Sequence, residues 1–265
     1  YTPYTTFNNS IPSSSCANQF APVFQPTATY TLNVLENGTI STTVGTLVAT
    51  DADASTAFHT LTVDSRSSTI VYAITNGNSL GHFAISSTTG VISVAAALDV
   101  ETVSSYTLSV TATDQGVMSV LSTSGTVTIS IGDVNDNTPV FGQVGGYSMS
   151  IAENATISTS VGSVSASDAD VTSPNNVVSF AISSGNTGNA FAISSSSGAI
   201  SVKSGLNYEV LNVYTLTITA SDGGSPSRSA SVSVTITITD VNDNAPLFNQ
   251  STYTMSIDEN SAGGT

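Results

Sequence analysis

The chain has 265 residues and a formal net charge of −15, from 18 acidic side chains and only 3 basic ones. This charge excludes nucleic acid as a natural partner, because the chain has no cationic surface that could displace the counterions of a phosphate backbone. The absence of any run of about 18 apolar residues predicts no membrane contact within this segment, and the single cysteine excludes a disulfide framework.

Residues 1–24 show no regular period and predict an extended leader. After them, short segments alternate apolar and polar residues, as at Tyr30, Leu32 and Val34, which is the pattern of a half-buried β-strand. About seven such segments follow, and no helical stretch lies among them. An all-β domain is therefore predicted over residues 25–137.

The same order of segments recurs over residues 138–244, and residues 245–265 supply the first strand of an incomplete third copy. The corresponding positions Phe24, Phe141 and Phe248 give periods of 117 and then 107 residues. That is the size of a seven-strand antiparallel sandwich. Self-similarity at such a period indicates tandem domains joined end to end.

A nine-residue string stands at the end of each complete copy. Asp133-Val-Asn-Asp-Asn-Thr-Pro-Val-Phe141 recurs as Asp240-Val-Asn-Asp-Asn-Ala-Pro-Leu-Phe248, with seven identical positions. Each string places two carboxylates and two side-chain amides within five residues, followed by a proline that prevents a helix. Oxygen ligands on an extended backbone are suited to a hard cation such as calcium.

Sixteen of the 18 acidic residues lie in short motifs at the ends of the predicted strands. A single Asp at such a place is usually a turn former, but recurrence in register indicates charges that bound cations neutralise. An EF-hand is excluded, because the stretch that begins at Asp51 lacks the glycine and the final glutamate of that loop. His59 and His82 have no cysteine cluster and no catalytic arrangement around them, so neither a zinc site nor enzymatic activity is expected.

This combination of motifs resembles the extracellular repeats of the cadherin superfamily. The motifs of the first copy that carry the resemblance are Glu36-Asn37, Asp51-x-Asp53, Leu98-Asp-x-Glu101, Asp114 and the string from Asp133. The resemblance covers residues 21–260 and implies tandem seven-strand antiparallel Greek-key sandwiches, immunoglobulin-like in character, joined by calcium-binding linkers. It also implies an extracellular or cell-surface location. Four Asn-x-Ser/Thr sequons fit that location and predict a glycoprotein, at Asn8, Asn37, Asn154 and Asn249.

The resemblance implies three calcium ions at the first linker. By that correspondence the ligands are Glu36, Asp99 and Glu101, then Asp133, Asn135 and Asp136 with the carbonyls of Val134 and Asn137, and finally Asp168, Asp170 and Asp222 with the carbonyl of Asn175. Without cations these carboxylates repel one another. The repulsion energy of one pair is on the order of 4 kcal/mol at a separation of ~4 Å and an effective dielectric constant of ~20. Calcium is therefore expected to make the linker rigid.

The second linker is expected to bind fewer ions, or to bind them more weakly, because Asn207 stands where the family motif has Asp. Its implied ligands are Glu153, Glu209, Asp240, Val241, Asn242, Asp243 and Asn244. A degenerate copy of the nine-residue string at residues 16–24 keeps Asn18 but neither carboxylate. It leaves Asp51, Asp53 and Asp114 at an incomplete site, where the alternatives are one ion or none.

Two functional hypotheses follow. The resemblance implies calcium-dependent adhesion or recognition, through pairing with other cadherin-like chains or with copies of the chain itself. The adhesion mode that docks an N-terminal tryptophan is excluded, because the chain has no Trp. The alternative is a structural subunit of an extracellular glycosylated fibre, a head-to-tail homopolymer assembled when the predicted strand at residues 250–257 adds to the sheet of a neighbour.

Overall fold

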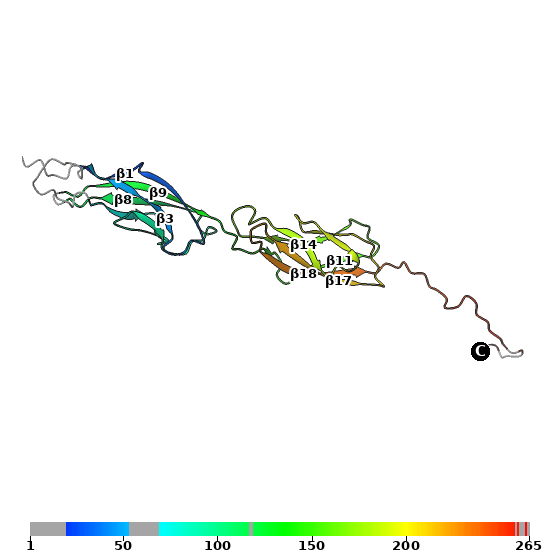
Figure 1. Cartoon of the computed structure of the whole chain (residues 1–265). Coiled ribbons are helices and arrows are strands. Elements are labelled where there is room, and N and C mark those ends of the chain that lie inside the picture. Colours follow the sequence, from blue (N-terminus) through cyan, green and yellow to red (C-terminus); the bar gives the residue numbers. More distant parts are fainter. Residues whose placement is uncertain (1–19, 53–68, 117–118, 258, 260–262, 264–265) are drawn as a thin grey trace, which may run out of the picture. The chain divides into compact units, whose positions relative to one another are not determined.

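The structure is a computed structural model that describes residues 20–52, 69–116, 119–257, 259 and 263 (Figure 1). Its regular structure consists of β-strands, apart from short turns such as η2 (Thr187–Asn189). The all-β class predicted from the sequence is therefore confirmed. Within these residues, no helix has the length and hydropathy needed to cross a membrane.

Among the described residues, the first copy contains nine strands where the sequence predicts about seven. One additional strand precedes the first predicted one, at the end of the segment expected to be a leader, and Pro26, which has no backbone N–H to donate to a ladder, separates the two. The second predicted strand is interrupted at Leu47. In chain order the strands are β1 (Val23–Gln25), β2 (Thr29–Leu35), β3 (Thr43–Thr46), β4 (Val48–Thr50), β5 (Val71–Asn76), β6 (Phe83–Ile85), β7 (Val91–Val94), β8 (Ser105–Thr113) and β9 (Ser122–Gly132).

These strands form a four-stranded sheet in the order β2-β9-β8-β5, a three-stranded sheet in the order β3-β7-β6, and the pair β1-β4. Most neighbours are antiparallel, as predicted, but β2 and β9 run parallel, with Leu32 opposite Ile129. The first and last strands of the copy can pair in this way because a long connection separates them, whereas a short hairpin allows only antiparallel pairing.

The core of the first copy follows the two-residue period of its strands. Along β8 the buried side chains are Tyr106, Leu108, Val110 and Ala112, while the residues between them are more exposed. The same alternation continues on β9 through Val127 and Ile129, which are fully buried. Both strands therefore present one continuous apolar face, and this face packs into a single cluster with the buried residues of β7.

The second copy repeats this arrangement. Its sheets have the orders β11-β18-β17-β14, β12-β16-β15 and β10-β13, and β11 runs parallel to β18 with Met149 opposite Ile236. The strands are β10 (Val140–Phe141), β11 (Tyr147–Ala152), β12 (Ser160–Ser163), β13 (Ala166–Ser167), β14 (Ser179–Ser184), β15 (Phe191–Ile193), β16 (Ala199–Val202), β17 (Val213–Ser221) and β18 (Ser229–Thr239).

The chain divides into two compact units whose limits are not those of the two copies. The first unit comprises Tyr1–Val140, Ala166–Ser179 and Ala220–Ala230, and the second comprises Phe141–Ser165, Phe180–Thr219 and Ser231–Thr265. The acidic motifs at Asp168, Asp170 and Asp222 therefore belong to the same unit as residues 133–140 of the first nine-residue string. The domain boundaries expected after residues 24, 137 and 244 stay a prediction.

Residues 245–257 contain no strand. The strand predicted at residues 250–257 is thus not formed in the structure, and the side chains of Leu247 and Met255 are both 93% exposed. A lone segment of this kind has no neighbouring strand to pair with its backbone, and an isolated strand is unstable in water.

Candidate metal centre

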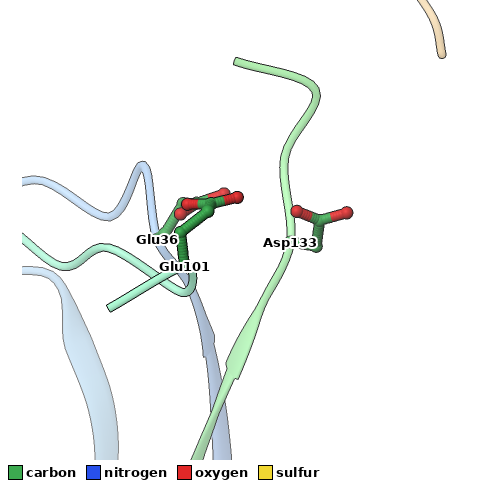
Figure 2. Close-up of side chains that lie close together, drawn as sticks. All are labelled: Glu36, Glu101 and Asp133. Atoms are coloured by element: carbon green, nitrogen blue, oxygen red, sulfur yellow. The ribbon is translucent and has the colours of Figure 1, made fainter. Parts of the chain in front are cut away.

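The parallel pairing of β2 with β9 places two acidic residues at the same end of a sheet. The last residues of these strands, Leu35 and Gly132, are partners in the register, so the residues that follow them, Glu36 and Asp133, emerge next to each other. Figure 2 shows the carboxylates of Glu36 and Glu101 close together and directed toward the segment that carries Asp133. Ligand atoms of these three residues lie within 4.8 Å of one another.

Two further acidic clusters in the first unit share members with this one. Glu101 also groups with Asp136 and Asp170, and Asp170 in turn groups with Asp168 and Asp222, at the same mutual separation of ligand atoms. Because Glu101 and Asp170 each belong to two clusters, the three clusters form one continuous row. Carboxylates shared in this way can bridge neighbouring cations, since a carboxylate has two oxygens.

Two buried carboxylate oxygens of this row, and one side-chain oxygen of the neighbouring nine-residue string, lack any hydrogen-bond partner. They are Oδ2 of Asp168, Oδ2 of Asp170 and Oδ1 of Asn135, and the last two residues are only 3% and 8% exposed. A buried, unpaired polar oxygen is costly, more so when it carries charge. The residues present therefore fit a cation that is held through oxygen ligands, which is the donor set that calcium prefers.

Electrostatics in the row disfavour negative charge in the absence of a cation. Although the Glu101 side chain is exposed, desolvation of its carboxyl among the neighbouring groups, with contributions from Asp99 and Glu36, raises its pKa to about 7. Desolvation of the carboxyl, followed by the charges of Glu36 and Asp170, raises the pKa of Asp136. Burial raises the pKa of Asp168, which is half-buried. A bound divalent cation would reverse this penalty, because it favours the ionised form of each ligand.

Two members of the row have lowered pKa values for a local reason. Burial alone would raise the pKa of Asp133, but hydrogen bonds from Thr172, Val171 and Asn175 outweigh it. The backbone N–H of Thr172 and the side-chain amide of Asn175 each donate to Oδ2 of Asp133 at 3.0 Å. For Asp222, burial is likewise outweighed by hydrogen bonds, chiefly those of the Arg228 backbone N–H and the Asn135 side chain.

One acidic cluster lies at the second nine-residue string, and its residues belong to the second unit. It joins Glu153, Glu209 and Asp243, and the side-chain amide of Asn244 donates to Oε1 of Glu209 at 2.6 Å. Within the described residues, neither Asp240 nor any other acid extends this cluster into a row.

A model of the cadherin domain matches residues 30–132 and 147–239. The chain belongs to the cadherin family. It is 41% identical to human Protocadherin Fat 1 over 195 residues, which cover 74% of this chain and 4% of that protein. It is 37% identical to the Drosophila melanogaster Protocadherin-like wing polarity protein stan over 255 residues, which cover 94% of this chain and 7% of that protein. The chain thus spans less than a tenth of the length of these two relatives.

Solved cadherin structures have the same fold. The EC22-24 segment of mouse Cadherin-23 superposes with a TM-score of 0.75 at 30% identity, covering 85% of this chain and 68% of that one. The cis-dimer structure of Protocadherin gammaB7 EC3-6 gives a TM-score of 0.72 at 29% identity, covering 86% of this chain and 53% of that one. The prediction of tandem cadherin repeats, each a Greek-key sandwich, is confirmed, and so is the extracellular or cell-surface location.

Asp99, which the cadherin pattern makes a ligand, belongs to none of the clusters found among the described residues. Its Oδ1 accepts the backbone N–H of Thr102 at 3.2 Å and its Oδ2 accepts the Thr102 hydroxyl at 2.8 Å. The hydrogen bond from the Thr102 side chain is the main reason why the pKa of Asp99 is lowered. In this structure Asp99 caps a turn, and its role as a ligand stays a prediction.

The implied backbone ligands make contacts through other atoms here. The N–H of Val134 donates to Glu36, the N–H of Asn137 donates to Oδ1 of Asp170 at 3.1 Å, and Asn175 contacts Asp133 through its side chain. Their carbonyl oxygens, like Val241 and Asn242 at the second string, stay predicted ligands.

The site predicted at the start of the first repeat lies partly outside the described residues, which omit Asn18, Asp53 and the leader up to residue 19. Asp114 is completely buried, and its carboxylate accepts the backbone N–H groups of Gly116 at 3.1 Å and Leu121 at 3.2 Å. Asp51 is half-buried. Whether one ion or none binds there stays open as predicted.

The sequence did not predict two residues that donate hydrogen bonds to the ligands of the first linker. Thr172 donates to Asp133, and Arg228 donates from Nε to the carbonyl of Asn135 at 2.9 Å. The rarity of basic residues was the only available signal, since Arg228 is one of 3 in the chain.

Proposed function

We propose that this chain is part of a calcium-dependent adhesion or recognition ectodomain, in which calcium bound at residues 133–137 stiffens the chain. The observation that carries the proposal is the row of three clusters joined through Glu101 and Asp170. The unpartnered buried oxygens along it support the same reading. No catalytic role is proposed.

We assign about three ions to the row, one for each cluster. Calcium is favoured over magnesium because calcium accepts six to eight oxygens in flexible geometry, whereas magnesium requires near-ideal octahedral geometry and keeps several of its waters. The bound ions would supply the positive charge that the carboxylates lack, and they would tie the linker to the segments that carry Asp168, Asp170 and Asp222. One further ion, more weakly held, is assigned to the cluster at Glu153.

Isothermal titration calorimetry with calcium tests this assignment. The whole chain should be compared with one variant in which Glu101→Gln and Asp170→Asn, which together reach all three clusters, disable the first row and with another in which Asp243→Asn disables the second cluster. The first variant should lose about three bound ions and the second about one. Loss of no ion or one ion from the first variant would refute the three-ion site.

Other cadherin-like chains, or copies of this chain, are the proposed partners. Family membership supports this, and one of the similar structures is described as a cis-dimer. Beads coated with the chain should aggregate in calcium and disperse in EDTA if the pairing is homophilic. If coated beads stay dispersed in calcium but bind beads carrying another cadherin, the pairing is heterophilic.

The alternative, a fibre subunit, rests on the apolar residues near the end of the described chain. Met255 is 93% exposed and Ile257 is 78% exposed, and residues 250–257 form no strand. Such a segment could add to the sheet edge of a second molecule. Electron micrographs of the chain in calcium would show long filaments if it does, and monomers or discrete pairs if it does not.

A further inference from the structure

The loop from Asp222 to Arg228 holds Asn135 by two hydrogen bonds that run in opposite directions. The side-chain Nδ2 of Asn135 donates to the carbonyl oxygen of Pro226 at 2.7 Å. In return, Nε of Arg228 donates to the backbone carbonyl oxygen of Asn135 at 2.9 Å. Both contacts lie within the first unit, and neither involves a carboxylate or needs a cation.

Gly224 supplies the space for this amide. A Cβ atom at Gly224 would lie 2.3 Å from both Cγ and Nδ2 of Asn135 and 2.7 Å from its Oδ1. The φ angle of Gly224 is not in the left-handed region. A glycine is therefore required here by the approach of the Asn135 side chain and not by the backbone conformation.

These contacts leave one polar atom of the amide free. Asn135 is 8% exposed, its Nδ2 and its backbone oxygen are paired, and its Oδ1 has no partner. The Asn135 side chain also acts on Asp222, whose pKa it helps to lower. The amide that carries the unpartnered Oδ1 therefore lies against the loop of Asp222, which is a member of the cluster with Asp168 and Asp170.

We propose that Arg228 and Gly224 are positioning residues that hold Asn135 with Oδ1 presented as a neutral ligand to the cation at this cluster. The inference rests on the proposed function, since it concerns the same calcium site. Holding the amide before the cation arrives lowers the entropic cost of binding, which is the general benefit of preorganisation.

Arg228 has two effects on the site, and they differ in sign. The positive charge of Arg228 helps to lower the pKa of Asp136, a member of the row. By itself this charge opposes the binding of a calcium ion nearby, because like charges repel. Its hydrogen bond to Asn135 favours binding by fixing the ligand. Substitutions can separate the two effects, because Arg228→Lys keeps the charge and loses the Nε donor, while Arg228→Met loses both the charge and every donor.

The test measures calcium binding to the whole chain by calorimetry, together with the side-chain NH₂ resonances of Asn135 in EDTA by NMR. These resonances can be assigned from their absence in Asn135→Asp. If the hydrogen bond to Asn135 is what favours binding, Arg228→Lys and Arg228→Met should both weaken one of the calcium-binding events by about two- to tenfold. The Asn135 NH₂ resonances should also shift and exchange faster with water in both variants without calcium.

Two matched controls are available in the second unit. Lys203→Gln removes a positive charge from a side chain that contacts Asn189, and calcium affinity should not change. Gly205→Ala adds a Cβ where no atom lies within 4 Å, whereas Gly224→Ala should weaken the same binding event as the Arg228 variants. In an Asn135→Ala background, Gly224→Ala should have no further effect, because the side chain that it meets is gone.

Unchanged affinity in Arg228→Lys, or tighter binding in Arg228→Met, would overturn the positioning role, because charge alone would then account for Arg228. An equal effect of Gly224→Ala with and without the Asn135 side chain would overturn the role of Gly224. Failure of the proposed function is a different result, in which the unsubstituted chain binds no calcium. Melting temperatures in EDTA identify any variant that fails to fold, and the NMR comparison of the remaining variants then decides.

Discussion

Oε1 of Glu36 accepts a hydrogen bond from the backbone N–H of Val134 at 2.7 Å. Its Oε2 accepts the backbone N–H of Val100 at 2.9 Å, and the side chain is 5% exposed. The second repeat has the same arrangement around Glu153, which accepts from Val241 at 2.8 Å and from Tyr208 at 2.7 Å. In each repeat one buried glutamate thus joins the nine-residue string to a turn of the sandwich before any cation binds.

Replacing Glu36 should therefore destabilise the first repeat even without calcium. Glu36→Ala leaves one buried N–H group, of Val100, and one half-buried N–H group, of Val134, without an acceptor, which should cost roughly 2–5 kcal/mol. Glu36→Gln should cost less because one acceptor oxygen remains. Urea denaturation in EDTA measures the difference. The control is Glu101→Ala, an exposed change in the same cluster, which should alter stability in EDTA by less than about 1 kcal/mol. Equal losses in the two alanine variants would contradict the structural role of Glu36.

Asp136→Ala should loosen the linker without unfolding the sandwiches. Asp136 is exposed and belongs to the middle cluster of the row, while the cores rest on the apolar faces of the strands. Small-angle X-ray scattering of the variant in calcium should show a broad distribution of shapes, like that expected of the unsubstituted chain in EDTA. The far-ultraviolet circular dichroism of the variant should keep its β signal. Loss of that signal in calcium would contradict this separation of roles.

Exchanging Asp99 and Asn207 between the repeats should alter calcium affinity in opposite directions. Both side chains cap turns, since Oδ1 of Asn207 accepts the backbone N–H of Val210 at 2.9 Å and Oδ1 of Asp99 accepts that of Thr102. The exchange therefore keeps an acceptor for the backbone cap at each position and changes the charge, although Asp99→Asn also leaves only one acceptor oxygen for the two donors of Thr102. Asp99→Asn should weaken binding at the first linker and Asn207→Asp should strengthen it at the second, each by roughly three- to tenfold. Calorimetry that finds no change in either variant would exclude both positions as ligands.

Calcium should raise the melting temperature in proportion to the logarithm of its free concentration. A ligand that binds only the folded state stabilises it by about 2.7 kcal/mol at a hundred times its dissociation constant. Differential scanning calorimetry across a calcium series checks this relation, and magnesium at equal concentration should have a smaller effect. A melting temperature that is the same in calcium and in EDTA would argue against a cation site in the folded chain.

Local patterns in the sequence were sufficient to predict much of this protein. The alternation along residues such as Tyr106, Leu108 and Val110 predicts a strand with one buried face, because side chains in a strand point to opposite faces in turn. The repeated string at Asp133 and Asp240 predicts tandem units and the chemistry of their ligands, because its oxygen donors are adjacent in the chain. The all-β class, the repeat and the identity of the acidic residues were all available from such local signals.

Only the tertiary structure decided which of these residues meet. The parallel register of Leu35 with Gly132 brings Glu36 next to Asp133, and strand pairing across so long a connection has no local signature. The hydrogen bond of Asp99 with Thr102 depends on the conformation of its own turn, and that of Arg228 with Asn135 depends on how two separate loops meet. Sequence by itself determined which oxygen donors the chain offers and at what period they recur, since both are written along the chain. Packing determined which oxygens share a cluster and which remain unpaired, since those properties arise only when distant segments are brought together.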